Sequence, residues 1–174
     1  ERADPNDPRG AGTIFDLDPA AYRKVFSLNY DGTLFPTLIF AADMAAARRG
    51  IILNISSMSA FRPLTKVPAY SSAKAAVNNF TAWLAVHLAP LGIRVNALAP
   101  GFLVTEQNRD LLTDPETGTP TARGEKILRQ TPFGRFARPK ELTGPALFLL
   151  SDLSAFVTGI VMPVDGGFNA YAGV

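Results

Sequence analysis

The sequence predicts an α/β fold, with residues 1–174 forming one domain in which helices pack on a parallel sheet. Three short apolar runs, at 51–55, 93–98 and 160–164, have the length and β-branched content of strands. Segments with helical spacing of apolar residues alternate with these runs, which is typical of parallel sheets with right-handed crossovers. Ligands of such sheets bind at the carboxyl ends of the strands, so we expect the functional residues there.

Residues 1–15 are rich in charge, proline and glycine and are predicted to form a loop. A helix is expected from Pro19 to about Arg49. Asp18 is a suitable N-cap, and proline is favoured at the first helical position. Gly50 is the expected helix stop.

Pro36 lies inside this predicted helix. It cannot donate a hydrogen bond to the carbonyl of Gly32, so we expect the helix to bend there. The bend would leave a carbonyl or a water free near Asn29.

The run 51–55 is predicted to be a strand buried on both faces. After a loop at 56–68, a helix is expected at 69–89, ended by Pro90 and Gly92. This helix is apolar around nearly its whole circumference. We therefore expect one face to cover the sheet and another to contact a second subunit.

The polar segment 102–138 is too long for an ordinary connection, and we interpret it as a lid. Short helices are expected within it, near 106–112 and 121–130. A helix disturbed by Pro145 should follow at 139–150, before the last strand at 160–164.

Tyr70 and Lys74 are four residues apart on a predicted helix and therefore share one face. An unperturbed phenol has a pKa near ~10, and a neighbouring cation favours its phenolate form. Ser57 follows a predicted strand end, where its hydroxyl could hold a substrate oxygen beside the phenol. These three residues predict proton transfer at the sheet edge.

Together with further motifs, these residues resemble the short-chain dehydrogenase/reductase family. The resemblance runs from about Asp16 to Phe168. Its motifs, in chain order, are Asn29, Asn54 with Ser57, Tyr70 with Lys74, Arg94 with Asn96, Pro100 with Gly101 and Thr105, and Thr158 with Gly159 before Asp165, Gly166 and Gly167.

The resemblance implies hydride transfer between NAD or NADP and a secondary alcohol or ketone. Tyr70 is implied to be the acid or base, and Lys74 to favour the phenolate and hold the nicotinamide ribose. Ser57 is implied to orient the substrate oxygen, and Asn29 to support a water leading toward the lysine.

The same resemblance implies nicotinamide contacts from the segment after the strand at 93–98. Pro100 and Gly101 are the expected contacts, and Thr105 is expected to donate to the carboxamide or a phosphate.

Three readings of the substrate and role stay open. The lid sequence looks most like sugar-acid members of the family, such as D-mannonate oxidoreductases, with Arg109, Arg123 or Arg135 as candidates for holding a carboxylate. A reductase of 3-oxoacyl-carrier thioesters would use the same catalytic residues. A non-catalytic fragment or scaffold would use none of them, and nicotinamide binding would separate it from an enzyme.

The implied fold is a Rossmann-like doubly wound sheet, but an incomplete one. The glycine-rich phosphate turn after a first strand, and the acidic residue that follows it, are not found in the sequence. We expect the natural protein to carry these N-terminal units. Without them the strand at 51–55 would have a bare edge, and residues 1–174 alone would be poorly soluble and bind neither cofactor.

The composition argues against several classes of binding partner. The net charge of +2 comes from scattered residues, which argues against a nucleic-acid partner. Without cysteine and with only His87, the sequence offers no thiolate or histidine cluster for a metal. No apolar run reaches the ~20 residues of a membrane span. The expectation is a cytoplasmic enzyme for a small-molecule substrate, and the resemblance implies a homotetramer.

Overall fold

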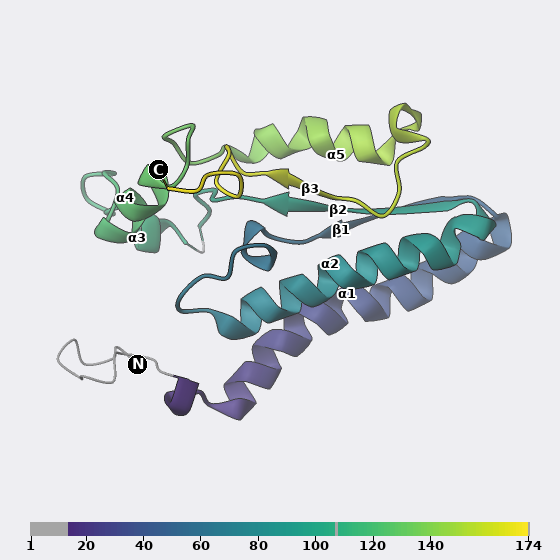
Figure 1. Ribbon diagram of the computed structural model, residues 1–174, viewed down its shortest axis with the longest axis horizontal. Coiled ribbons are helices and arrows are strands. Elements are labelled where there is room, and N and C mark those ends of the chain that lie inside the picture. Colours follow the sequence, from purple (N-terminus) through teal and green to yellow (C-terminus); the bar gives the residue numbers. More distant parts are fainter. Residues whose placement is uncertain (1–13, 107, 174) are drawn as a thin grey trace.

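The computed structural model describes residues 14–106 and 108–173, so most of the predicted loop 1–15 lies outside the described residues. Three parallel strands form one sheet in the order β1-β2-β3, which confirms the predicted α/β class. Helices α1 and α2 lie on one face of the sheet and α5 on the other (Figure 1). The strands are β1 (Gly50–Ile55), β2 (Ile93–Pro100) and β3 (Val161–Val164), and the α-helices are α1 (Pro19–Ala47), α2 (Pro68–Leu88), α3 (Arg109–Leu112), α4 (Ala122–Arg129) and α5 (Thr143–Leu150).

The register of the strands brings their carboxyl ends to one edge. Ile55 pairs with Leu98 at the end of β1, and Pro100 pairs with Val164 at the ends of β2 and β3. Beyond the ladder, the amide of Gly101 donates to the carbonyl of Val164 at 3.0 Å. The segments that follow all three strands therefore start side by side.

Helix α1 begins as predicted and ends earlier than predicted. Its N-cap is Asp18, whose carboxylate accepts from the amide of Ala20 at 2.9 Å. Gly50 is not the helix stop, because α1 ends at Ala47 and Arg48 is the C-cap, with a left-handed φ of 50°. Gly50 instead starts β1, where a Cβ would lie 2.6 Å from a side chain of the last helical turn.

Pro36 does not interrupt α1, which is one continuous helix. Figure 1 shows the first part of α1 sloping more steeply than the rest. The hydroxyl of Thr33 donates to the carbonyl of Asn29 at 3.2 Å, and that of Thr37 donates to the carbonyl of Thr33 at 2.7 Å. Hydroxyl bonds of this kind often accompany bent helices.

The core lies between α2 and the centre of the sheet. Leu84, Ala85 and Leu88 of α2 pack on Ile93 and Val95 of β2, and all five are buried. Near its end α2 passes into a 3₁₀ turn, Ala89–Leu91, and the left-handed Gly92 closes it as predicted.

β1 was expected to be buried on both faces, and this expectation is wrong. Of its residues only Asn54 is buried, and Ile55 is 53 % exposed. The reason is that β1 is an edge strand within the described part of the chain.

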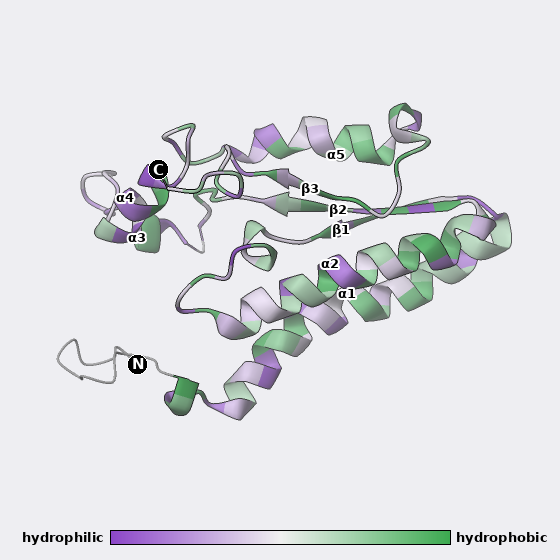
Figure 2. Cartoon of the chain, in the orientation of Figure 1, coloured by the Kyte–Doolittle hydropathy of each residue, from purple (hydrophilic) through white to green (hydrophobic). Residues whose placement is uncertain are grey.

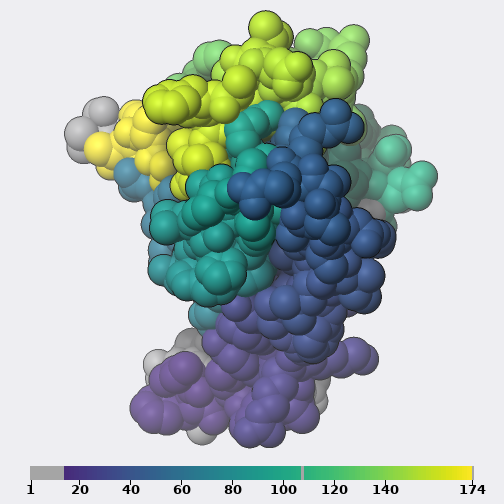
Figure 3. Space-filling view, turned by 90° about the vertical axis from the view of Figure 1, so that its right-hand side faces the viewer, coloured from purple at the N-terminus to yellow at the C-terminus, as the bar shows by residue number. Residues whose placement is uncertain are grey.

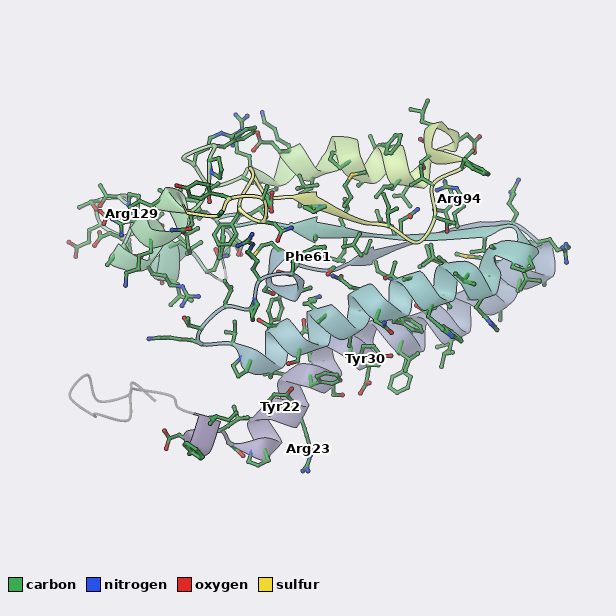
Figure 4. All side chains as sticks on the ribbon, viewed as in Figure 1. Tyr22, Arg23, Tyr30, Phe61, Arg94 and Arg129 are labelled. Carbon is green, nitrogen blue, oxygen red and sulfur yellow. The ribbon has the colours of Figure 1, made fainter. Side chains whose placement is uncertain are left out.

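Arg94 of β2 anchors the end of α5. Its guanidinium donates to the carbonyls of Leu149 and Val157, each at 3.2 Å, and to that of Ser151 at 3.0 Å. The last carbonyls of a helix have no partner inside the helix, and a cation beside them also interacts favourably with the helix dipole. This half-buried arginine thus fixes α5 on the sheet (Figure 4).

The lid segment contains the predicted helices in shorter form. The helix expected at 106–112 is only Arg109–Leu112, and the helix expected at 139–150 begins as a 3₁₀ turn, Pro139–Leu142, before α5. Thr121 caps α4 by accepting from the amide of Gly124 at 3.1 Å. Among the described residues, no helix has the length and apolar character needed to cross a membrane.

Candidate active site

Tyr70 and Lys74 lie in the first turns of α2, beside the carboxyl end of β1. The Lys74 Nζ atom is 5.6 Å from the centroid of the Tyr70 ring. The same Nζ atom donates to the carbonyl of Ile55 at 2.9 Å. Burial lowers the pKa of Lys74, because the charged ammonium loses hydration there. The Ile55 carbonyl partly compensates by accepting one of its hydrogens.

Ser57 lies two residues after the end of β1 and is buried, with 9 % of its surface exposed. It caps the short 3₁₀ helix Met58–Ala60, and its Oγ accepts from the amide of Ser59 at 3.2 Å and from the hydroxyl of Ser59 at 3.1 Å. A serine hydroxyl accepts through two lone pairs and donates once. Both acceptor positions are therefore used, and no hydrogen bond donated by the Ser57 hydroxyl is found within the described part of the chain.

A buried row of polar groups joins β1 to α2, and the sequence interpretation missed most of it. The Asn54 amide donates to the hydroxyl of Thr81 at 2.9 Å. The hydroxyl of Ser56 donates to the side-chain oxygen of Asn78. Asn78 and Thr81 lie one and two turns beyond Lys74, so helical spacing from the lysine was the available signal. Asn54 thus forms a hydrogen bond near the end of β1.

Asn29 and Lys74 line the same cavity. The cavity has a volume of about 500 Å³ and lies between α1 and β1. The side chain of Asn29 donates to the carbonyl of Val25 at 2.9 Å, so it bonds within its own helix. Asn29 and Lys74 nevertheless both line this one cavity.

Pro100 and Gly101 stand at the end of β2, in the centre of the strand-end edge. A Cβ on Gly101 would lie 2.6 Å from the Cα of Asp165, so only glycine permits this close approach. Thr105 is exposed, and its amide donates to the side-chain oxygen of Asn108 at 2.8 Å. Asn108, which the sequence interpretation did not single out, also donates to the carbonyl of Leu103 at 2.9 Å and so shapes this loop.

Asp165 forms a turn through its side chain. The Asp165 carboxylate accepts from the amides of Gly167 at 3.0 Å and Asn169 at 2.8 Å. Gly166 and Gly167 both have positive φ angles, of 64° and 90°. The turn holds the segment after β3 against Gly101.

The three candidate arginines of the lid have different surroundings. Arg135 donates to both oxygens of Glu141, at 2.8 and 2.7 Å, so its guanidinium is already engaged by a carboxylate. Arg109 is exposed at the start of α3. Arg123 lies on α4 and lines a second cavity of about 390 Å³. Only Arg123 combines a cavity position with a guanidinium that has no ion-pair partner in the described chain.

Known proteins similar to this chain include oxidoreductases. Residues 5–169 match the family model described as Enoyl-(Acyl carrier protein) reductase. An uncharacterized oxidoreductase of Haemophilus influenzae is 59 % identical over 163 residues, which cover 93 % of this chain and 57 % of that protein.

Solved structures of similar proteins agree in fold. A protein from Haemophilus influenzae, provisionally named a D-mannonate oxidoreductase and solved with bound NAD, has a TM-score of 0.89 and 56 % identity, over 100 % of this chain and 61 % of that one. A gluconate 5-dehydrogenase from Burkholderia cenocepacia, solved with NADP and tartrate, has a TM-score of 0.85 and 32 % identity, over 92 % and 61 %. The chain thus spans about three fifths of the length of these relatives.

The Arg135–Glu141 contact predicts a pH-dependent contribution to stability. The hydrogen bond from Arg135, with further ones from the amide and side chain of Arg138, holds the pKa of Glu141 well below its usual range. A glutamate in an unfolded chain has a pKa near ~4.3, so the ionised carboxylate stabilises the fold above that pH and the contribution is lost as the pH falls. We expect the urea midpoint of Glu141→Gln to lie below that of the unsubstituted protein by a constant amount above about pH 5, and the difference to shrink below about pH 4.

The matched control is Glu125→Gln, at an exposed glutamate of α4 that has no ion-pair partner among the described residues. Its midpoint should follow that of the unsubstituted protein across the pH range. If the deficit of Glu141→Gln persisted unchanged down to about pH 3, the ion pair would not be its cause.

Proposed function

The chain belongs to the short-chain dehydrogenase/reductase family, and we propose that the whole protein transfers a hydride between a nicotinamide cofactor and a secondary alcohol or ketone. The observation that carries this proposal is that the Lys74 ammonium lies beside the Tyr70 ring and binds the carbonyl of Ile55, two residues before Ser57, at the carboxyl end of β1. The combination of an available hydroxyl proton, a phenol and an ammonium suits proton transfer to and from a substrate oxygen.

The residues present fit the nicotinamide end of NAD or NADP. The Lys74 ammonium and the Tyr70 hydroxyl suit the hydroxyls of a ribose, and the exposed Thr105 hydroxyl suits the carboxamide or a phosphate. Pro100 and Gly101 offer a close-packed backbone at the strand-end edge, where ligands of parallel sheets bind. The cofactor would supply the hydride chemistry. Relatives solved with NAD and with NADP support either cofactor.

We assign the proton steps to this chain's own side chains. In the direction of reduction, the Ser57 hydroxyl donates a hydrogen bond to the carbonyl oxygen of the substrate, and Tyr70 gives that oxygen its proton. In the direction of oxidation, Tyr70 removes the proton from the alcohol. The Lys74 ammonium favours the phenolate that forms, and Ile55 and the buried row at Asn54 and Ser56 hold the lysine in place.

For the substrate we propose a sugar acid of the mannonate or fructuronate type. The 56 % identity to the provisionally named D-mannonate oxidoreductase supports this choice. A reductase of 3-oxoacyl-carrier thioesters is the second candidate, because the matching family model carries an acyl-carrier description. Turnover of a sugar acid against turnover of an acyl-carrier thioester separates the two.

We propose further that the protein is a homotetramer that associates through α1 and α2. These helices pack side by side (Figure 3). Their ribbons carry many hydrophobic residues (Figure 2), and several large apolar side chains on them are exposed. The exposed fractions are 57 % for Phe35, 63 % for Leu38, 56 % for Trp83 and 78 % for Val86. Exposed apolar patches of this kind mark interaction surfaces on soluble proteins.

The association predicts that a charge on this surface reduces the assembly. Val86→Glu should lower the molar mass measured by light scattering at micromolar concentration, since a buried glutamate without a partner is costly. Leu111→Glu, at a position that is 60 % exposed on α3, is the control and should leave the mass unchanged. A monodisperse monomer for the unsubstituted natural protein would rule the association out.

The proton-transfer assignment predicts the effect of removing one hydroxyl. In the natural full-length protein, Tyr70→Phe should lower kcat by about 10²–10⁴-fold while nearly preserving cofactor binding, because only the proton-transfer group is lost. Lys74→Ala should impair both, since the lysine serves phenol and ribose. Steady-state kinetics and nicotinamide fluorescence measure the two properties.

Tyr22→Phe, in the first turn of α1, is the matched control and should leave kcat unchanged, because no proton step is assigned to Tyr22 (Figure 4). A Tyr70→Phe enzyme with near-normal kcat would show that another group moves the proton.

A further inference from the structure

The second cavity, of about 390 Å³, lies between segments that adjoin the catalytic residues in the chain. One wall is the loop 63–66, which leads into α2 and ends four residues before Tyr70. Another wall includes Phe102, which directly follows Gly101. The remaining walls come from α4 and Phe168. The cavity is therefore placed to receive the part of a substrate that extends away from the reacting carbon.

The cavity has an apolar floor. The rings of Phe102 and Phe168 meet edge to face, with centroids 5.4 Å apart and planes inclined by 60°. Ile127 of α4 is buried beside them, and Leu64 contributes from the loop. Arg62 donates to the carbonyl of Asn169 at 2.9 Å, which ties the loop before α2 to the segment after β3. Such a floor can pack against the carbon chain of a small substrate.

The charges around this floor are all of one sign. Lys66, Arg123 and Lys126 line the cavity, and none of its lining residues is acidic. Arg123 and Lys126 are three residues apart on α4 and so share a face. Within residues 14–106 and 108–173, none of the three has an ion-pair partner. This distinguishes them from Arg135, which Glu141 holds in a bidentate pair.

We propose that Lys66, Arg123 and Lys126 bind the carboxylate of the substrate, so that the site selects a sugar acid over the corresponding neutral polyol. The planar guanidinium of Arg123 can hold a carboxylate through two parallel hydrogen bonds, and the two lysines add positive charge. The proposal rests on the proposed function, because it assumes that the reacting carbon lies at Tyr70. Of the three arginines that the sequence suggested, it keeps Arg123, leaves out Arg109 and Arg135, and adds two lysines that the sequence did not single out.

The test compares D-mannonate with D-mannitol, which carries a hydroxymethyl group in place of the carboxylate. Dissociation constants are measured by titration calorimetry on the natural full-length protein saturated with NADH, which cannot oxidise mannonate, and kcat/KM is measured separately with NAD. Arg123→Gln and Lys126→Gln should each weaken mannonate binding by about tenfold, the usual scale for a lost charge-assisted hydrogen bond. Mannitol binding should not change.

Arg129→Gln is the matched control, because Arg129 lies in the same last turn of α4 as Lys126 but does not line the cavity (Figure 4). It should change mannonate binding by less than about twofold, as expected of an exposed charge. Arg129→Gln also removes a cation from the last turn of α4, so it controls for any lost interaction between Lys126 and the helix dipole.

The proposal is overturned if the unsubstituted protein binds mannonate no better than mannitol, or if Arg123→Gln and Lys126→Gln weaken both ligands equally. It is also overturned if the enzyme reduces a 3-oxoacyl-carrier thioester and neither Arg123→Gln nor Lys126→Gln changes the affinity for mannonate. If mannonate binding depends on the cations but no secondary alcohol or ketone is turned over, the anion site stands and the hydride-transfer proposal fails.

Discussion

The contact between α2 and β1 is the constraint on which the candidate site depends. Asn54 donates a hydrogen bond to Thr81, and Ser56 donates one to Asn78. The ammonium of Lys74 donates one to the carbonyl of Ile55. Polar groups buried without partners are costly, so sliding the helix along the strand would break several bonds at once. This register of α2 on β1 places Tyr70 and Lys74 near the carboxyl end of β1, which Ser57 follows by two residues.

The parallel arrangement of the strands extends this local contact into a complete edge. The strands end at the same edge, where the amide of Ser56 donates to the carbonyl of Leu98 and the turn at Asp165 packs against Gly101. Lys74 is a compromise within this arrangement. Burial lowers its pKa and so disfavours the ammonium that the proposed chemistry uses, and the strand-end carbonyl of Ile55 offsets part of that effect.

Much of the fold and of the site's core could be predicted from local patterns. Helical periodicity predicted α1 and α2, and the Asp18 cap predicted where α1 begins. The spacing of Tyr70 and Lys74 predicted that they share one face of α2. Non-local partners decided what the sequence missed. Arg48 ends α1 with a left-handed backbone, and its guanidinium donates to the carbonyl of Pro90 at 2.8 Å. Arg135 is engaged because the turn Pro139–Leu142 brings Glu141 to it. The partial exposure of β1 depends on its place in the sheet, which no local pattern reports.

The central claim is that this edge supports hydride transfer to a carbonyl carbon. Its most direct test uses the natural full-length protein, a nicotinamide cofactor carrying deuterium at the transferable position, and fructuronate. The product is examined by mass spectrometry and proton NMR. The account predicts one deuterium on the new carbinol carbon, on a single face, with none acquired when the unlabelled cofactor is used in deuterated water. The claim would be contradicted if the hydrogen on the carbinol carbon came from the solvent. It would also be contradicted if the protein reduced no ketone in a panel that includes a 3-oxoacyl thioester.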